Sequence, residues 1–184
     1  TVRLIPDKKQ RRILTAMVRS DIKCATSSSV GRIFDGAAAL LGVCEHNHFE
    51  AQAAMMLESL ASQSDSFSRH ETLFNIHDNQ IDLSPLVKVL VKGGDVQHLA
   101  ALLHDQLACA WATVAQQHAQ QSGITAIALS GGVFCNQRLT DRLTSLLERN
   151  GLTVLRHQQV PPNDGGLALG QAAIAVKHFA RKAG

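Results

Sequence analysis

Tyrosine is absent from this sequence of 184 residues, and aromatic residues make up only 4% of it. The core must therefore be built from Leu, Ala, Val and Ile, a composition that favours helices. No stretch approaches the roughly 18 consecutive apolar residues of a membrane-spanning helix, and no signal peptide is visible. We therefore expect a soluble cytoplasmic protein that has no membrane partner.

Paired cysteines are also lacking. The four cysteines, Cys24, Cys44, Cys109 and Cys135, are widely separated and form no CxxC pair. This spacing suggests neither a zinc knuckle nor a disulfide framework. We expect free thiols in a reducing compartment.

Several catalytic signatures are missing as well. The sequence contains no GxSxG elbow, no Walker A loop, no GxGxxG fingerprint and no HxxxH or HExxH pair. A hydrolase of the Ser-His-Asp type is therefore not indicated. Any metal site that uses a histidine pair would need ligands from outside this sequence.

A strong charge of either sign is lacking too. The net charge is +3, and the densest basic run, which consists of Lys8, Lys9, Arg11 and Arg12, has no interleaved aromatic residues. Such a run is more typical of a solvated helix face than of a nucleic-acid surface. We do not expect nucleic acid as a partner.

What is present is an ordinary globular composition with long helical patterns. Hydrophobic residues make up 45% of the sequence, which predicts a packed core. Apolar residues at steps of three and four predict helices over 6–19, 31–41, 50–61, 84–91, 95–121 and 136–150, and a last one that ends near 181. Alternation between Phe74 and Leu83 predicts a small hairpin that turns at 77–80.

Two short apolar runs, near 125–130 and 152–157, predict strands, and each is followed by a loop and a helix. This order indicates an α/β fold in which both loops lie at the carboxyl ends of strands, where open sheets hold their ligands. No repeat, low-complexity tract or linker interrupts the pattern, so residues 1–184 are predicted to form a single domain. The sequence opens at Thr1 rather than at a methionine, which we interpret as a piece of a longer protein.

The loop after the first strand offers Ser130, Gly131 and Gly132, followed by Asn136. Two glycines allow a backbone to approach a phosphate or a ribose closely, although a plain strand-to-helix turn would use the same residues. Asn136 is suited either to capping the next helix or to binding the hydroxyl groups of a nucleotide. Capping is the stronger interpretation.

Two carboxylates stand out. Asp35 lies among apolar neighbours near a helix start, where it could stabilise the helix dipole or point into a site. Asp164 follows two prolines and an asparagine and precedes two glycines, a setting that suits either a metal ligand or a helix N-cap.

Two other residues receive structural interpretations. His104 falls within the longest predicted helix, where a hydrogen-bonded, partly buried histidine is favoured over a catalytic one. Cys135 is interpreted as a small packing residue, because it has no evident base partner.

Four motifs in this order resemble one family. They are TSSSVGRIFDGAAALLG (26–42), FEAQAA (49–54), LSGGVFCN (129–136) and VPPNDGGLALGQA (160–172). Together they are similar to the C-terminal lobe of HypF-type carbamoyltransferases, which make the precursor of the cyanide ligand of [NiFe] hydrogenases. The resemblance implies one helix-rich lobe of the actin-like ATPase fold, with a mixed sheet that includes both predicted strands.

The resemblance also implies a chemistry, namely carbamoyl transfer from carbamoyl phosphate through a carbamoyl-adenylate held between two lobes. It places Asp35, Ser130, Gly131, Gly132 and Asn136 at the nucleotide, and Asp164 at a divalent metal that would be Fe, Zn or Mg. The implied cofactors are ATP and this metal. The implied partners are the N-terminal lobe with its HxxxH-like histidines, carbamoyl phosphate, and a maturation protein that carries an acceptor cysteine.

The sequence departs from the family pattern at two positions. Ala51 replaces the glycine of a Tyr-Glu-Gly-Gln motif, and Cys135 stands where glutamine is frequent. Two alternatives stay open at this stage. One is a TsaD-like transferase of tRNA modification, and the other is a catalytically incomplete lobe that binds a partner.

Overall fold

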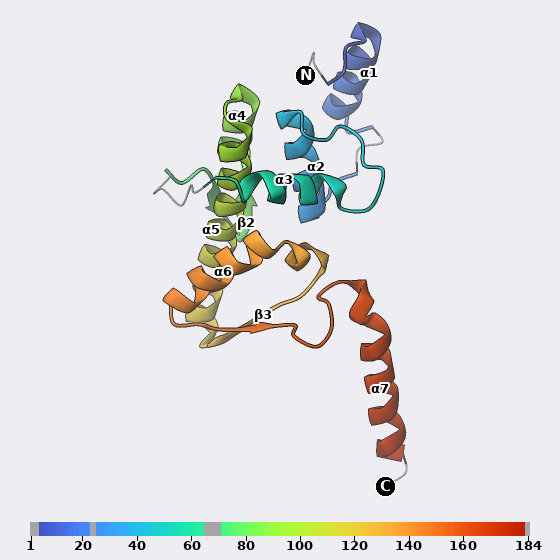
Figure 1. Cartoon of the computed structure of the whole chain (residues 1–184), viewed down its shortest axis with the longest axis vertical. Helices are drawn as coiled ribbons and strands as arrows, with labels where there is room; N and C mark the ends of the chain where they lie inside the picture. Colours follow the sequence, from blue (N-terminus) through green and yellow to red (C-terminus); the bar gives the residue numbers. More distant parts are fainter. Residues whose placement is uncertain (1–3, 23–24, 65–70, 183–184) are drawn as a thin grey trace.

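The computed structural model describes residues 4–22, 25–64 and 71–182 of the chain (Figure 1). Cys24 lies outside these ranges. Within them the elements, in chain order, are α1 (Lys8–Arg19), α2 (Val30–Leu41), α3 (Gln52–Ala61), β1 (Asn75–His77), β2 (Gln80–Asp82), α4 (Ser84–Lys92), α5 (Val96–Ser122), β3 (Ala126–Leu129), η1 (Gly132–Cys135), α6 (Gln137–Arg149), β4 (Thr153–Arg156), η2 (Asp164–Gly166) and α7 (Leu167–Lys182). The predicted helix-rich α/β chain is confirmed.

The long helix α5 forms the centre of the core. It begins after Asp95, whose side chain accepts a hydrogen bond from the His98 N–H at 3.0 Å, and it ends at Gly123 in the left-handed conformation. Small buried residues such as Ala101 and Ala108 let α3 and α6 pack closely on it. The core is therefore built from Leu and Ala, as the scarcity of aromatic residues predicts.

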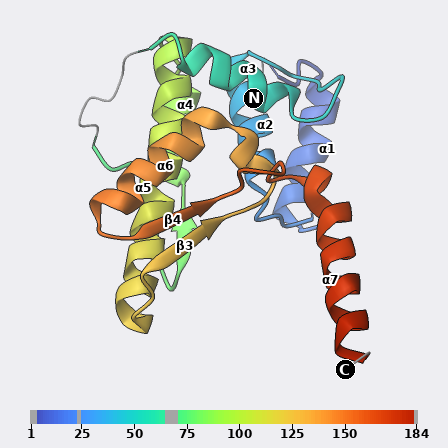
Figure 2. The same ribbon diagram turned by 60° about the horizontal axis from the view of Figure 1, so that its bottom comes forward.

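The two predicted strands pair in parallel. Ala126 lies opposite Thr153 and Leu129 opposite Arg156, so the loops that follow both strands leave from the same edge. Figure 2 shows β3 and β4 side by side, with α6 lying between this pair and α3. One backbone hydrogen bond, from the Gly131 N–H to the Pro162 carbonyl at 2.8 Å, joins the two loops.

The predicted hairpin is also present. β1 and β2 pair antiparallel, and Asp78 and Asn79 at its tip both have positive φ, as a two-residue hairpin turn requires. Asp82 then accepts a hydrogen bond from the Ser84 N–H at 2.8 Å as α4 begins. Among the described residues, antiparallel and parallel pairing thus occur in two separate two-stranded sheets, and not in the one mixed sheet that the resemblance implies.

The first and last helices lie outside this core. α1 buries none of its residues, and α7 extends away from the rest of the chain (Figure 1). Both expose large apolar side chains, among them Val18, which is 71% exposed, and Phe179, which is 70% exposed. Exposed apolar surfaces of this kind are typical of contact sites for other protein segments.

The observed helix starts differ slightly from the predicted ones. α1 begins at Lys8 rather than Pro6, because the Asp7 side chain caps it by accepting from the Gln10 N–H at 2.8 Å. α3 begins at Gln52 rather than Glu50, because Ala51 is left-handed. No described helix combines the length and the apolar character that crossing a bilayer requires.

Candidate functional site

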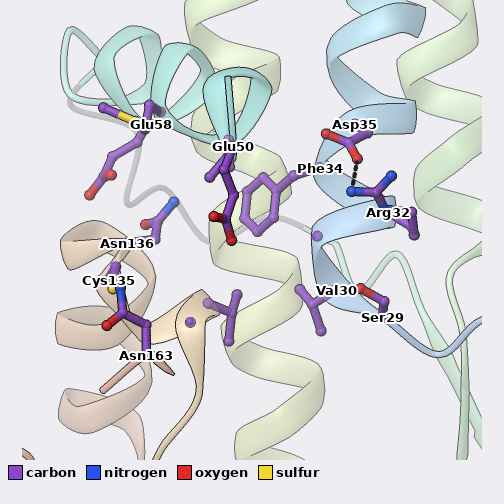
Figure 3. Close-up of a pocket in the computed structure, with 16 residues that line it drawn as sticks. Ser29, Val30, Arg32, Phe34, Asp35, Glu50, Glu58, Cys135, Asn136 and Asn163 are labelled. Atoms are coloured by element: carbon purple, nitrogen blue, oxygen red, sulfur yellow. Dashed lines mark ion pairs between the residues drawn. The ribbon is translucent and has the colours of Figure 1, made fainter. Parts of the chain in front are cut away.

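One cavity of about 640 Å³ gathers residues from all four sequence motifs (Figure 3). Its lining comprises Ser29, Val30, Gly31, Arg32, Phe34, Asp35, Glu50, Ala51, Ala54, Met55, Glu58, Gly132, Val133, Cys135, Asn136 and Asn163. α2 forms one wall, α3 with the turn before it forms a second, and η1 with the start of α6 forms a third. Segments that are far apart in the sequence therefore meet at one place.

Asp35 is held by two partners on the α2 wall. Its Oδ2 pairs with Nη2 of Arg32 at 2.8 Å, and its Oδ1 accepts a hydrogen bond from Nδ2 of Asn47 at 2.9 Å. Asn47 also accepts from the Ala53 N–H at 3.0 Å, which links α2 to the first turn of α3. Asp35 thus lines the cavity and also orders the loop that leads to α3.

Ala51 occupies a backbone conformation that favours glycine. Its φ is 60° and its ψ is 14°, which is the left-handed region, and its carbonyl accepts from the Met55 N–H at 3.0 Å. A side chain in this region costs roughly 1–2 kcal/mol relative to the right-handed form. Although alanine stands at this position in place of the family glycine, its backbone still adopts a conformation that favours glycine.

The Ser-Gly-Gly loop is divided between the cavity and the strand edge. Gly132 lines the cavity, whereas Ser130 and Gly131 do not. Gly131 has a φ of 114°, which requires a glycine, and Ser130 Oγ lies 3.0 Å from Nε2 of His157 in the loop after β4. The structure thus brings Gly132 together with Asp35 but leaves its two neighbours at the sheet edge.

Asn136 caps α6 and also contacts the core. Its Oδ1 accepts from the Leu139 N–H at 2.9 Å, and its Nδ2 lies 2.9 Å from Nε2 of His104. Nδ1 of His104 lies 2.7 Å from the Ala100 carbonyl oxygen. A carbonyl oxygen can only accept a hydrogen bond, so Nδ1 carries the proton and Nε2 accepts from Asn136.

His104 is wholly buried, with an exposed fraction of 0%, rather than partly buried as the sequence suggests. Burial, the largest cause, and the charge of Arg138 together lower its pKa from 6.5 to about 4, against the opposing effect of the Ala100 hydrogen bond. The imidazole is therefore neutral at pH 7. It packs on Phe34, a cavity residue, with 5.1 Å between ring centroids.

Two carboxylates that line the cavity are not identified from the sequence. Glu50 lies in the turn before α3, and Glu58 lies within α3, where its Oε1 accepts a hydrogen bond from the Arg138 N–H at 3.1 Å. Both carboxylates point from this wall toward the side on which Asn136 lies (Figure 3). The only sequence signal for Glu58 is its place on the helix that begins within FEAQAA, and that signal does not reveal its partner 80 residues away.

Asp164 lies outside this cavity and is exposed. The N-cap interpretation of Asp164 is wrong, because Asn163 performs that role by accepting from the Gly165 N–H at 3.0 Å. Within the described ranges, no three or more His, Cys, Asp or Glu side chains come close enough together to hold a metal ion. The described residues therefore do not form a complete metal site, and Asp164 can supply one ligand at most.

Cys135 is exposed and lines the cavity, so its interpretation as a packing residue is wrong. Cys44, Cys109 and Cys135 are all free thiols, as the spacing predicts.

Comparison with known proteins gives the family that the four motifs resemble. A family described as "Carbamoyltransferase, Kae1-like domain, second subdomain" matches residues 2–171. The chain is 37% identical over 167 residues to carbamoyltransferase HypF of Rhodobacter capsulatus, covering 90% of this chain and 22% of that protein. It is 38% identical over 176 residues to a carbamoyltransferase HypF homolog of Cupriavidus necator, covering 90% of this chain and 45% of that protein.

Solved structures agree in fold. A crystal structure of full-length HypF in the phosphate- and nucleotide-bound form superposes with a TM-score of 0.79 at 34% identity, covering 94% of this chain and 23% of that one. The crystal structure of T. kodakarensis HypF gives a TM-score of 0.80 at 30% identity, covering 97% and 24% respectively. The chain therefore spans less than half the length of each of these relatives.

Proposed function

Because the chain belongs to the HypF carbamoyltransferase family, as the second subdomain of its Kae1-like domain, we propose that it supplies one side of the nucleotide site of a carbamoyl transfer enzyme. The reaction is the transfer of a carbamoyl group that originates in carbamoyl phosphate and passes through carbamoyl-adenylate. Its role is to make the cyanide-ligand precursor for [NiFe] hydrogenases. The acceptor is a cysteine thiol of a maturation partner.

The observation that carries this proposal is the cavity between α2, α3 and η1. It combines an apolar surface, which includes Phe34, Val30 and Val133, with the carboxylates of Asp35 and Glu58. A flat heterocycle can pack on the apolar surface, and ribose hydroxyls can donate hydrogen bonds to the carboxylates. The nucleoside half of ATP has both features, and one solved relative is described as nucleotide-bound.

Within this cavity we assign nucleotide contacts to Asp35, Gly132 and Asn136. Asn136 uses one oxygen lone pair and one N–H for its cap and for His104, so its second N–H is the group left for a ligand. Ser130 and Gly131 lie at the strand edge, where they face the loop that carries Asp164. These two residues and Asp164 are assigned to the phosphate and metal side of the site.

We assign the other side of the site to a separate subdomain. The chain covers 22% of one relative and 24% of a solved relative, which supports a larger whole. The exposed apolar side chains of α1 and α7 are suited to contact with that subdomain. The metal, when bound, would offset the charge of the phosphates, and Asp164 would be one of its ligands.

The proposal is tested in a protein that includes the preceding subdomain. We expect ATP cleavage to AMP and pyrophosphate that depends on carbamoyl phosphate. We expect Asp35→Asn to reduce this rate about tenfold or more, because it removes the negative charge of the Asp35 carboxylate, which we assign to the nucleotide. A correctly folded protein without this cleavage, or with cleavage that depends on tRNA instead, would contradict the proposal.

A further inference from the structure

Glu58 connects two walls of the cavity, α3 and the start of α6, which lie far apart in the sequence. Its side chain is half-buried on α3, and its Oε1 accepts the hydrogen bond from the Arg138 N–H on α6 at 3.1 Å. Arg138 is the second residue of α6. A carboxylate from one helix therefore sits directly on the first turn of another.

The first turn of a helix is the place where proteins commonly bind phosphate. Its N–H groups have no partner within the helix, and the helix dipole favours negative charge there. Two of these donors in α6 are already engaged, because Glu58 accepts from the Arg138 N–H and Asn136 accepts from the Leu139 N–H. The Ser-Gly-Gly loop thus leads into a helix whose anion position is filled by the protein itself.

The charge of the cavity lining also disfavours the binding of phosphate. Three carboxylates line it, those of Asp35, Glu50 and Glu58, and Arg32 is the basic residue of the lining. The guanidinium of Arg32 is paired with Asp35 at 2.8 Å. A phosphate that entered this cavity would meet the carboxylates of Glu50 and Glu58 beside this ion pair.

We infer that Glu58 excludes phosphate from this cavity by occupying the anion position at the start of α6, and so reserves the cavity for the nucleoside end of the ligand. The inference rests on the proposed nucleotide site and adds the orientation of the ligand in it. The phosphates then extend away from Glu58, toward the edge where the loops after β3 and β4 meet.

The test uses inorganic phosphate and the purified chain, with the Arg138 and Leu139 amide signals followed by NMR. In the wild-type chain we expect phosphate to leave both signals in place. In Glu58→Ala we expect saturable shifts of both signals, with an affinity for phosphate at least about tenfold higher than in the wild type. Phosphate binding at these amides in the wild type, or none in Glu58→Ala, would overturn the inference.

Two further variants keep the test decisive. Glu50→Ala removes the same charge from the same cavity but not from the start of α6, so we expect less than about a twofold gain. An equal gain in both alanine variants would assign the effect to net charge and not to Glu58. Glu58→Gln retains an oxygen for the Arg138 N–H, so we expect its gain in affinity for phosphate to be intermediate. If Glu58→Ala does not fold, the absence of any such gain in Glu58→Gln overturns the inference.

Adenosine, added to separate samples, tests the nucleotide site independently. In the wild-type protein that includes the preceding subdomain, we expect it to shift the signals of cavity residues such as Gly132 and Ala51. If adenosine shifts none of them, the nucleotide site is refuted, whatever phosphate does. If adenosine binds but Glu58→Ala gains no affinity for phosphate, only the inference about Glu58 fails.

Discussion

The side-chain nitrogen Nδ2 of Asn136 lies 2.9 Å from Nε2 of His104, and through this contact the cap of α6 is tied to the centre of α5. His104 is wholly buried and Asn136 is 7% exposed. Asn136 also lines the candidate cavity. The residue that shapes the cavity wall is therefore anchored in the core rather than in the loop that precedes it.

The first prediction concerns this anchor. Asn136→Ala removes the cap of α6 and leaves Nε2 of His104 without its donor, so we expect a loss of about 2–3 kcal/mol in the free energy of unfolding. The measurement is urea unfolding followed by circular dichroism. Asp95→Ala is the matched control, because it removes an exposed cap from α5, and we expect it to cost about 1 kcal/mol. Equal losses in the two variants would show that the bond to His104 contributes nothing.

A second prediction concerns acid. The pKa of His104 is about 4 in the folded chain and 6.5 without its environment, so above pH 6.5 the histidine is neutral in both states and its contribution is constant. As the pH falls through 6.5, the unfolded state takes up a proton first, and stability declines until the folded state also protonates near pH 4. The total loss is about 3 kcal/mol.

Unfolding in urea at a series of pH values between 4 and 7 measures this loss. His104→Gln removes the titrating group, so the slope of stability against pH should become shallower in this window. A slope that is unchanged in the variant would show that other groups account for the acid sensitivity.

A third prediction uses the left-handed residue before α3. Ala51→Gly relieves the strain at a φ of 60° but gives the unfolded chain more freedom, so we expect a net gain of about 0.5–1 kcal/mol. Ala54→Gly, in the body of α3, should instead lose about 1 kcal/mol. Thermal unfolding of both variants decides the matter, and a loss of stability in Ala51→Gly would contradict the strain argument.

The fourth prediction separates Asp164 from its neighbour. Since Asn163 provides the cap, Asp164→Ala should change the unfolding free energy by less than about 0.5 kcal/mol. In the protein that includes the preceding subdomain, the same change should abolish bound metal and ATP cleavage. Metal content by elemental analysis and the cleavage assay test this expectation.

Asn163→Ala serves as the counterpart, because it removes the cap and leaves the carboxylate. We expect it to cost about 1 kcal/mol while metal binding is retained. Retention of both metal and activity in Asp164→Ala would rule out its proposed role as a ligand.

Much of the fold follows from local patterns. The hairpin tip at Asp78 and Asn79 and the cap at Asn136 depend only on residues a few positions apart, and each lies where the sequence predicts. The end of α5 at Ser122 lies one residue beyond the predicted end at 121. Boundaries that differ, such as the start of α3 at Gln52, do so because Ala51 takes a conformation that propensity disfavours. No local pattern signals that choice.

The candidate site divides in the same way. The sequence determines the motifs, and with them the family and the two strand-loop-helix units, because these features depend on residue type and short spacing. Only the tertiary structure decides that Gly132 and Asn136 share a cavity with Asp35, that Asp164 does not line it, and that Cys135 faces outward. It alone reveals Glu58, because a hydrogen bond across 80 residues arises from the packing of α3 and α6 on α5, and no periodicity along the chain records how separate helices pack in space.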